Sequence, residues 1–509
     1  MNICLIKPPI LHKGASFALM PTPPLGLAYI AGALKKEGHN LQAIDASAEG
    51  INNVSPFKDE IFIFGLTNEE VISRVRGEID VFCVSCMFTN NWLYDRELIK
   101  ELKKHYPEAI IIVGGEHANA APEFCLKQSP ADFIVFGEGE ETIVDLVREI
   151  DAEKQFNKIK GISYWDENEI IVRKNRSRIS DIKDIAWPAW ELFPLELYFE
   201  NKMSHGVYRG RTLPVMATRG CPYECTFCSS PQMWGRKYEM RPPSDFVDEL
   251  ELYNKEFRVT NFDLFDLTAI IHKKWILEMC EELDKRGLNI TYQLPSGTRA
   301  EAIDFEVATA LFNSGCKNIT YAPESGSDRV LKAVKKKVKV ENMLTSIAHS
   351  TKAGMNIHLN MIIGFPDDKH IDMLQTLRFV VKSSWYGAND LAIAVFTPYP
   401  GSKLFERLEK EGKIDLYQDQ TLEDIISSYD LWPNKVYSYN INPTLIKMYV
   451  FLMLITFYST NYIFRPIRLY RTLRNIALKK HESRLEQILY KNFFKNLFST
   501  FSVSTQKKA

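Results

Sequence analysis

The chain has 509 residues, of which 45% are hydrophobic and 25% charged, and its formal net charge is −1. A mean hydropathy of −0.19, together with this balanced charge, excludes a polytopic membrane protein, a disordered polymer and a polycation that coats nucleic acid. The length predicts about two to four domains, with enough apolar residues for a core in each.

The cysteines and the N-terminus both favour a cytoplasmic location. The nine cysteines are too few and too scattered to predict a disulfide framework. The N-terminal sequence MNICLIKPP has no charged region followed by an apolar stretch and a cleavage site, so we do not expect a signal peptide.

The first 150 residues alternate short apolar runs of strand length with helical patterns such as Leu25–Lys36 and Trp92–His105. The apolar runs are continuous, which is typical of strands buried on both faces of a parallel sheet. We therefore predict a doubly wound, Rossmann-like α/β domain, with its ligand site beyond the carboxyl ends of the strands. The predicted strands are Ile3–Ile6, Leu41–Ile44, Val81–Ser85, Ile110–Val113 and Phe133–Phe136.

The rest of the chain divides into three further regions. Residues 151–209 predict a small hairpin and a packed linker rich in proline and aromatic residues. Residues 210–415 predict six βα units, which form a (βα)6 partial TIM barrel with its chemistry at the carboxyl ends of the strands. Residues 416–509 lose this alternation and are predicted to be helical. The expected barrel strands are Leu213–Thr218, Phe262–Phe265, Ile290–Leu294, Asn318–Tyr321, Ile357–Ile363 and Leu391–Phe396, with helices such as Pro243–Lys255 and Lys273–Lys285 between them.

The strongest motif is RGCPYECTFCSS, which spaces Cys221, Cys225 and Cys228 as C-x3-C-x2-C after the first predicted barrel strand. Three thiolates at this spacing can bind one iron–sulfur cube and leave one iron open to a substrate or cofactor. The alternatives are inert thiols or a zinc site, but zinc needs a fourth ligand, and the nearest histidine, His205, precedes the strand. We therefore predict an iron–sulfur cluster.

This motif, in a barrel of six βα units, resembles the radical S-adenosylmethionine (radical SAM) superfamily. The preceding α/β domain narrows the resemblance to the cobalamin-binding-domain subgroup, which includes the class B methyltransferases. The resemblance implies that the three cysteines hold a 4Fe–4S cluster, whose open iron binds SAM. It also implies that Phe227 and Gly364 lie near the adenine of SAM, and that Glu324 and Ser325 contact its amino acid or ribose. Relatives often carry two acidic residues where this chain reads FDLT, with Asp266 alone.

The first domain departs from the cobalamin-binding pattern at one position. Relatives that ligate cobalt with a histidine carry D-x-H-x-x-G, then S-x-L, then GG. The corresponding residues here are Asp45 and Ser47, then Ser85, then Gly114 and Gly115. Serine cannot ligate cobalt, so one interpretation is that cobalamin binds base-off without a protein ligand. The other is a scaffold that no longer binds cobalamin.

Three other features are expected to have ordinary structural roles. His117 follows the two glycines and is interpreted as a hydrogen-bonded residue rather than a cobalt ligand. The motif GEGEET at 137–142 predicts a tight turn into a helix whose N-terminus favours acidic residues. The run Lys335–Lys337 predicts a solvated surface.

The C-terminal region is basic, because residues 465–509 contain eleven Lys/Arg and two Glu. The apolar segment Leu445–Phe464 has an uninterrupted core, Tyr449–Tyr458, that is too short to span a bilayer. One interpretation is a set of helices lying on an anionic membrane surface; the other is a helical cap on the barrel with its basic face in water. The residues behind both are a stripe of arginines, Arg465, Arg468, Arg471 and Arg474, and the apolar Phe493, Phe494, Leu497 and Phe498.

The resemblance implies cobalamin-dependent methylation of an unactivated carbon in a small-molecule or lipid-like substrate. The alternatives are a non-methylating cyclisation, C–C coupling or oxidative rearrangement with a scaffold-only first domain, and a non-catalytic cobalamin or SAM sensor. An electron donor of the flavodoxin or ferredoxin type is implied. No nucleic acid partner is expected, because no separate RNA-binding module is visible. The protein is expected in the cytoplasm, either free or peripheral on the inner face of the membrane.

Overall fold

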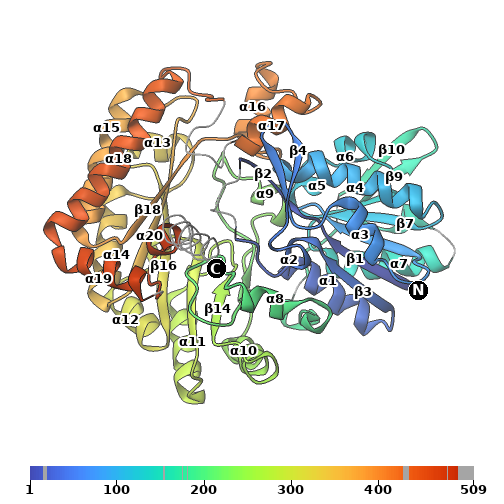
Figure 1. Ribbon diagram of the computed structural model, residues 1–509, viewed down its shortest axis with the longest axis horizontal. Coiled ribbons are helices and arrows are strands. Elements are labelled where there is room, and N and C mark those ends of the chain that lie inside the picture. The colour runs from blue at the N-terminus through green and yellow to red at the C-terminus, as the bar shows by residue number, and fades with distance from the viewer. Residues whose placement is uncertain are drawn as a thin grey trace, which may run out of the picture.

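Two large α/β halves lie side by side, the first in blue and cyan and the second mainly in green and yellow in Figure 1. The computed structural model describes residues 1–14, 20–152, 155–174, 176–179, 181–427, 435–478 and 480–490. The apolar Phe493, Phe494, Leu497 and Phe498 therefore lie outside the described residues.

The first half is built on a sheet of seven strands with a parallel centre, which confirms the predicted doubly wound fold. Alternate residues of its strands feed two separate cores, because α1 (Leu25–Lys36) and α7 (Gly139–Asp151) cover one face, and α4 (Trp92–His105) and α6 (Pro122–Gln128) the other. In spatial order the strands are β10 (Glu169–Arg173), β9 (Ile162–Asp166), β8 (Phe133–Val135), β7 (Ile110–Gly114), β6 (Val81–Ser85), β1 (Asn2–Lys7) and β3 (Asn40–Asp45).

The predicted hairpin is present as β9 and β10, and it extends this sheet through antiparallel pairing with β8. A second, three-stranded sheet was not predicted from the sequence. Its strands are short, and one of them contains a proline, so they lack a clear pattern of their own. They are β2 (Ile10–Lys13), β4 (Val54–Lys58) and β5 (Ile61–Phe64), which pair antiparallel in the order β2-β5-β4.

The second half is a six-stranded parallel sheet in sequential order, as predicted for a partial barrel. Helices α10 (Pro243–Phe257), α11 (Lys273–Arg286), α12 (Phe305–Asn313), α14 (Val340–Ala353) and α15 (His370–Tyr386) connect its strands. The strands are β11 (Thr212–Val215), β14 (Asn261–Leu264), β15 (Thr291–Thr298), β16 (Cys316–Glu324), β17 (Asn356–Ile363) and β18 (Asp390–Val395).

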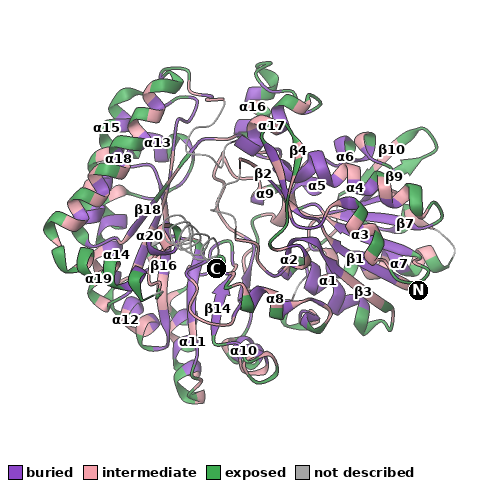
Figure 2. Cartoon of the chain, viewed as in Figure 1, coloured by how far each residue is buried: buried purple, intermediate pink, exposed green. Residues whose placement is uncertain are grey.

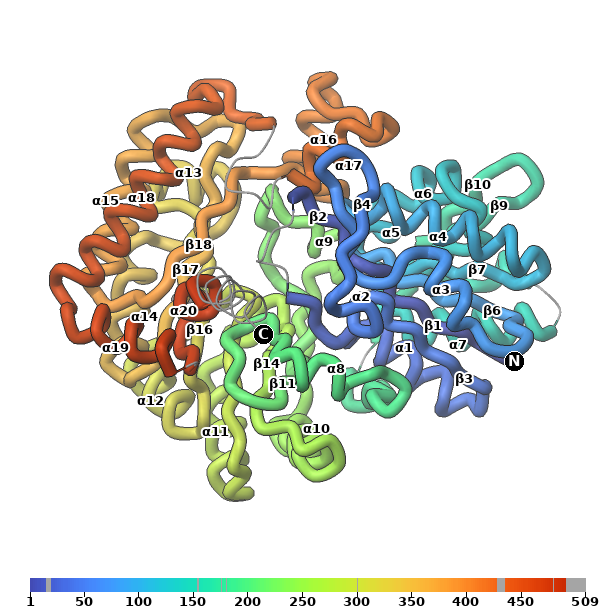
Figure 3. Tube along the Cα trace, viewed as in Figure 1, coloured from blue at the N-terminus to red at the C-terminus, as the bar shows by residue number. Residues whose placement is uncertain are grey.

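After the last barrel strand the chain returns to the first half. The trace in Figure 3 leads from β18 to α16 (Lys403–Lys410) and α17 (Asp419–Ser427), beside β2 and β4. Leu404, Phe405, Leu422 and Ile426 join the second core of the first half. The two halves are therefore held together by a shared apolar core.

The C-terminal helices pack on the outside of the barrel. Helix α18 (Pro443–Phe464) runs along α15 and buries one face. It is followed by α19 (Pro466–Ala477) and α20 (Arg484–Leu489). By length and composition α18 could cross a membrane, alone among the helices of the described residues. Its buried residues recur every three to four positions, which is the pattern of a packed helix: Ile446, Val450, Met453, Phe457 and Asn461.

The predicted single stripe of four arginines is wrong. The helix breaks at Arg465, and Pro466 begins α19. Arg465 donates to the carbonyl oxygens of residues 384 and 385, and Arg468 to those of residues 387 and 388. Cationic side chains are favoured there, because the carbonyl groups at the end of α15 carry partial negative charge. Only Arg471 and Arg474 of the four remain exposed.

Candidate functional site

The three cysteines of the motif lie in a loop between two short paired strands, β12 (Thr218–Arg219) and β13 (Glu239–Met240). Gly220 opens the loop with φ +88°, and a Cβ atom there would lie 2.0 Å from the carbonyl oxygen of Lys237, so only glycine fits. The Thr226 N–H donates to the Val334 carbonyl (3.0 Å), and the Thr226 carbonyl accepts from the Leu404 N–H (2.9 Å). The loop is thus fixed at the carboxyl end of the barrel.

Cys221, Cys225 and Cys228 are half-buried, whereas the other six cysteines are buried. Burial raises the pKa of Cys225, although the nearby charges of Lys336 and Arg299 oppose this, and burial raises the pKa of Cys228 to about 11. Bound iron would supply positive charge that favours the thiolate form of such thiols. Among the described residues, no three His, Cys, Asp or Glu side chains, these cysteines included, are arranged around a common metal position. By chemistry, three thiols on one short loop are the donor set that an iron–sulfur cluster uses.

Glu324 and Lys336 form a buried ion pair beside the loop that carries the three cysteines. Glu324 ends β16 in a left-handed conformation (φ 63°), and its Oε1 accepts from Lys336 Nζ at 2.7 Å. Lys336 Nζ also lies 6.0 Å from the centre of the Phe227 ring. Burial alone would lower the pKa of Lys336, but the charge of Glu324 raises it above its ordinary value. The structure thus brings Phe227, Glu324 and Lys336 together near Cys225.

The expectation that residues 335–337 form a solvated surface is wrong for the middle lysine. Lys336 is only 8% exposed, while Lys335 and Lys337 point to solvent. A run of three lysines carries no sign of which one turns inward. The opposite charge of Glu324 decides it, because a buried charge needs a partner.

Two other SAM candidates have their polar groups engaged within the protein. Ser325 Oγ accepts from the Ser327 N–H (3.1 Å) and lies 3.3 Å from Thr376 Oγ1. The Gly364 N–H donates to Asp368 Oδ2 (2.9 Å). Asp266 is buried as well and accepts from the Thr218 backbone and hydroxyl, so it holds the strand end that precedes the cysteines. Burial raises the pKa of Asp266 to about 6.

The cobalamin candidates in the first half lie at the carboxyl ends of β3, β6 and β7. Asp45 caps the short helix α2 (Ala46–Glu49) and accepts from the Tyr198 hydroxyl (2.6 Å), while Lys7 Nζ lies 3.5 Å away. Ser47 is buried, and its Oγ donates to the Pro8 carbonyl (3.1 Å). Both side chains of the D-x-S pattern are therefore engaged within the protein.

The glycine pair offers open space at the same edge. A Cβ atom on Gly114 would meet nothing within 4 Å, whereas one on Gly115 (φ +126°) would lie 2.4 Å from the Cys86 carbonyl oxygen. Ser85 pairs with Gly114 in the sheet, and the nearby Met87 and Phe88 are 41% and 58% exposed. Open space beside exposed apolar side chains fits a large, partly apolar group such as cobalamin.

His117 is not at this open edge. It lies in α5 (Glu116–Ala120), packed on Trp92 and Phe124, with Nδ1 3.0 Å from Thr89 Oγ1. Burial lowers its pKa to about 3.

The GEGEET motif does more than begin a helix. Glu138 and Glu140 are buried and form ion pairs with Arg219, which lies two residues before Cys221. Sequence reasoning missed this contact because the partners are about 80 residues apart and no spacing rule links them.

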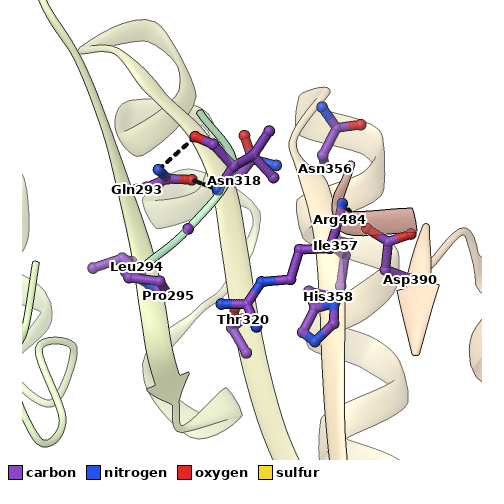
Figure 4. A pocket seen from close by; sticks show the side chains of 12 residues that line it. Gln293, Leu294, Pro295, Asn318, Thr320, Asn356, Ile357, His358, Asp390 and Arg484 are labelled. Atoms are coloured by element: carbon purple, nitrogen blue, oxygen red, sulfur yellow. Dashed lines mark hydrogen bonds between the residues drawn. The ribbon is translucent and has the colours of Figure 1, made fainter. Parts of the chain in front are cut away.

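A polar pocket lies lower in the barrel, where β15 to β18 begin (Figure 4). It has about 280 Å³ of empty space, partly open to solvent. Arg484 reaches into the pocket from α20. Its backbone N–H donates to Asp390 Oδ2 (2.7 Å), and its side-chain Nη2 donates to the His205 carbonyl (2.8 Å). Burial lowers the pKa of His205 to about 4. Nothing in the sequence pattern linked α20 to the barrel interior. The other polar lining residues are Gln293, Asn318, Thr320, Asn356 and His358.

Comparisons with known proteins identify both halves. Residues 18–147 match the sequence profile of the B12 binding domain family, and residues 215–380 match that of the radical SAM superfamily. An uncharacterized methyltransferase PH0819 of Pyrococcus horikoshii is 28% identical over 411 residues, which cover 80% of this chain and 83% of that protein. The cytidylyl-2-hydroxyethylphosphonate methyltransferase of Streptomyces wedmorensis is 28% identical over 448 residues, covering 81% and 83%.

Another relative is named for a reaction other than methyl transfer. The anaerobic magnesium-protoporphyrin IX monomethyl ester cyclase of Cereibacter sphaeroides is 27% identical over 422 residues, covering 81% of this chain and 64% of that protein.

Among solved structures, the radical SAM methyltransferase TsrM from Kitasatospora setae, with cobalamin and a [4Fe-4S] cluster bound, gives a TM-score of 0.63 at 15% identity, covering 81% of this chain and 78% of that chain. The cobalamin-dependent radical SAM enzyme OxsB with aqua-cobalamin gives 0.67 at 17% identity, covering 97% and 75%. These structures share the fold.

Proposed function

Because the chain belongs to the radical SAM enzymes that carry an N-terminal cobalamin-binding domain, we propose that it methylates an unactivated carbon of a small-molecule or lipid-like substrate. One observation carries this proposal: the cysteine loop of the barrel is bonded directly to residues that follow the strand ends of the first half, where the space at Gly114 lies open. A substrate between the two would face both cofactors.

The cofactors of this family are a 4Fe–4S cluster, SAM and cobalamin. When bound, the cluster and SAM supply hydrogen-abstracting radical chemistry, and cobalamin supplies a methyl group. The contribution of the protein is to hold these groups at fixed positions and to exclude side reactions. Cys221, Cys225 and Cys228 would ligate the cluster.

We infer that Glu324 and Lys336 help to hold SAM, with Phe227 beside its adenine. The ammonium and carboxylate groups of an amino acid need partners of opposite charge, and this buried pair offers both signs near Cys225. Ser325 and Gly364 would act through backbone and shape, because their hydrogen-bonding groups are already engaged.

In the first half, Asp45, Ser47, Ser85, Gly114 and Gly115 would line the cobalamin site. The engagement of Ser47 with a backbone carbonyl supports the interpretation that cobalt has no ligand from this position. The open space at Gly114 would receive part of the nucleotide tail.

The test is anaerobic reconstitution with iron, sulfide, SAM, cobalamin and a reductant, followed by incubation with a metabolite and lipid extract of the host. Methylation adds about 14 Da to one compound in the extract. The second candidate function, a non-methylating cyclisation or rearrangement, is favoured by the relationship to the cyclases. It would give a product without the added methyl group. An electron donor of the flavodoxin or ferredoxin type would replace the chemical reductant in the cell.

We further propose that the protein contacts the inner face of the membrane through the outer surface of α15, α18 and α19, and we call this surface the outer face. Figure 2 shows exposed residues along these helices at the edge of the molecule. The only acidic residue of the three helices, Asp372, is buried, while Arg378, Lys382, Arg471 and Arg474 are exposed. The apolar residues of the outer face are Ile371, Leu374, Trp385, Met448, Phe451, Leu452, Ile455, Ile463, Phe464, Ile467, Tyr470 and Leu473.

A monomeric protein in water rarely exposes so many large apolar side chains together. An apolar surface with basic and no acidic residues at its margins is complementary to anionic lipid. The protein would then lie in the cytoplasm as a peripheral membrane protein, close to a lipid-like substrate.

A further inference from the structure

The cluster loop, residues 219–229, is joined at both of its ends to the first half of the molecule. The joining groups are carboxylates that follow neighbouring strands, β7 and β8, of the first sheet. Neither joint involves a cluster ligand directly. Each lies within two residues of one, so it can set where that ligand stands.

The first joint holds Arg219, which precedes Cys221 by two residues. Its guanidinium is 4% exposed and donates to Glu138 Oε1 (3.3 Å) and to Glu140 Oε1 (2.5 Å). Arg178 donates to both oxygens of Glu138, from Nε to Oε2 and from Nη2 to Oε1, both at 3.2 Å. Burial alone would raise the pKa of Glu138, but the two guanidinium groups hold it below its ordinary value. This joint is therefore a buried ionic network in which Arg178 and Arg219 share Glu138.

The second joint holds Ser229, the residue after Cys228. Its hydroxyl donates to Glu116 Oε1 at 2.6 Å. Glu116 directly follows Gly115 and begins α5, which packs on α9 (Ser230–Trp234), the helix that follows the cluster loop. A direct connection thus leads from the open space at Gly114, through the Glu116 carboxylate and the Ser229 hydroxyl, to the proposed ligand Cys228.

We propose that these two joints couple cobalamin binding in the first half to the order of the cluster loop in the barrel. Binding at the Gly114–Gly115 edge would fix Glu116, and through it Ser229 and Cys228. Assembly of the cluster would order the same loop from the other side, because metal binding supplies ordering free energy to its ligands. If cobalamin binding and cluster assembly both order the cluster loop, each favours the other, because the second event loses less conformational entropy than it would alone.

Thermodynamic linkage makes this coupling reciprocal. Cobalamin should bind more tightly to the cluster-loaded protein than to the apoprotein, and the added cobalamin should stabilise the cluster against chelation by the same factor. The proposal rests on the family's cofactors but not on methyl transfer, so it holds for either candidate function.

The test compares the Kd of hydroxocobalamin for the full-length apoprotein and for the anaerobically reconstituted protein. We expect the loaded protein to bind about fivefold or more tightly. The Mössbauer signal of the oxidised cluster should also change on adding cobalamin. Equal Kd values with an unchanged signal would overturn the proposal. Absence of cobalamin binding in both states would overturn the cobalamin assignment together with it.

Two variants with matched controls locate the coupling. Ser229→Ala removes the second joint, and the control Ser129→Ala removes a buried hydroxyl in the first half that donates to the Cys125 carbonyl. Arg219→Lys weakens the first joint, and the control Arg176→Lys weakens a more exposed pair of ionic contacts with Glu141 and Asp145 of α7. The Kd ratio should fall toward one in Ser229→Ala and Arg219→Lys at normal iron content, and stay unchanged in the controls. A Kd ratio that is unchanged in both test variants would overturn the proposal. If these variants fail to fold, the Kd ratio and the cluster signal of the wild-type protein decide it.

Discussion

At the scale of single residues, the exposure of the cysteines separates the three proposed cluster ligands from the other six. The six lie in buried cores, where they pack as small apolar residues. The three in the loop keep part of their surface free, and the charges of Lys336 and Arg299 lie near Cys225. The sequence spacing singled out the same three cysteines, because close neighbours in one loop can converge on one cluster.

Replacing Cys221, Cys225 or Cys228 by alanine should abolish cluster absorbance and 5′-deoxyadenosine formation, because each change would remove one of the three proposed ligands. The reconstituted wild-type protein should contain about four irons per chain. Cys280→Ala is the control, since Cys280 is buried beside the Tyr292 hydroxyl. It should keep the cluster and lower only the stability. A loop variant that retained a normal cluster would refute the ligand assignment.

The buried pair of Glu324 and Lys336 predicts a second difference between neighbours. Lys336→Met leaves the Glu324 carboxylate buried without a partner, which should cost about 3–5 kcal/mol of unfolding free energy and weaken SAM binding. Lys337→Met changes an exposed lysine one residue away and should alter stability by no more than about 0.5 kcal/mol. Urea denaturation and equilibrium dialysis with SAM measure the two effects. Equal stability and SAM affinity in the two variants would contradict the inferred role of Lys336.

At the scale of elements, helix α18 has two faces with opposite roles. Met453 is fully buried, whereas Met448, on the same helix, is 60% exposed. Met453→Ala should therefore lower the unfolding free energy by about 2–5 kcal/mol, and Met448→Ala by about 0.5 kcal/mol or less. Chemical denaturation measures both. A small loss in Met453→Ala would mean that α18 is not a packed part of the barrel.

Local sequence patterns predicted most of the elements correctly. The helices Leu25–Lys36 and Trp92–His105 have the predicted bounds, and all six barrel strands lie at the predicted places. These elements have strong periodicity and clear ends. The short strands β2, β4 and β5 were missed, because runs of four or five residues without a turn signal resemble loops.

Contacts between distant segments could not be predicted in this way. Lys336 turns inward toward Glu324, Arg468 turns toward the end of α15, and Glu140 reaches Arg219 across the two halves. Each depends on where the fold places a charge of opposite sign or a free carbonyl. Spacing along the chain contains no information about that placement.

At the scale of the whole molecule, the outer face predicts binding to vesicles that contain anionic lipid. Reversing Arg378 and Lys382 to glutamate should weaken this binding at low salt, since each basic residue near the surface contributes about 1 kcal/mol. Replacing Ile463 and Ile467 by serine should weaken the part of the binding that persists at high salt. Vesicle co-sedimentation over a salt series separates the two contributions.

The control for charge reverses Lys274 and Lys285 on α11, another exposed barrel helix, and should leave vesicle binding unchanged. Failure of the wild-type protein to bind anionic vesicles at low salt would contradict the membrane proposal. If size-exclusion chromatography with light scattering then showed a dimer that the Ile463 and Ile467 changes disrupt, the outer face would be an interface between two copies.

The central claim is that the two halves work together in methyl transfer, and the products of SAM report on it directly. The proposed methylation would consume two molecules of SAM, one for radical formation and one as the source of the methyl group. The reconstituted enzyme, incubated with host extract and a reductant, should therefore form 5′-deoxyadenosine and S-adenosylhomocysteine in about equal, substrate-dependent amounts. 5′-Deoxyadenosine without S-adenosylhomocysteine would contradict methyl transfer and favour a cyclisation or rearrangement.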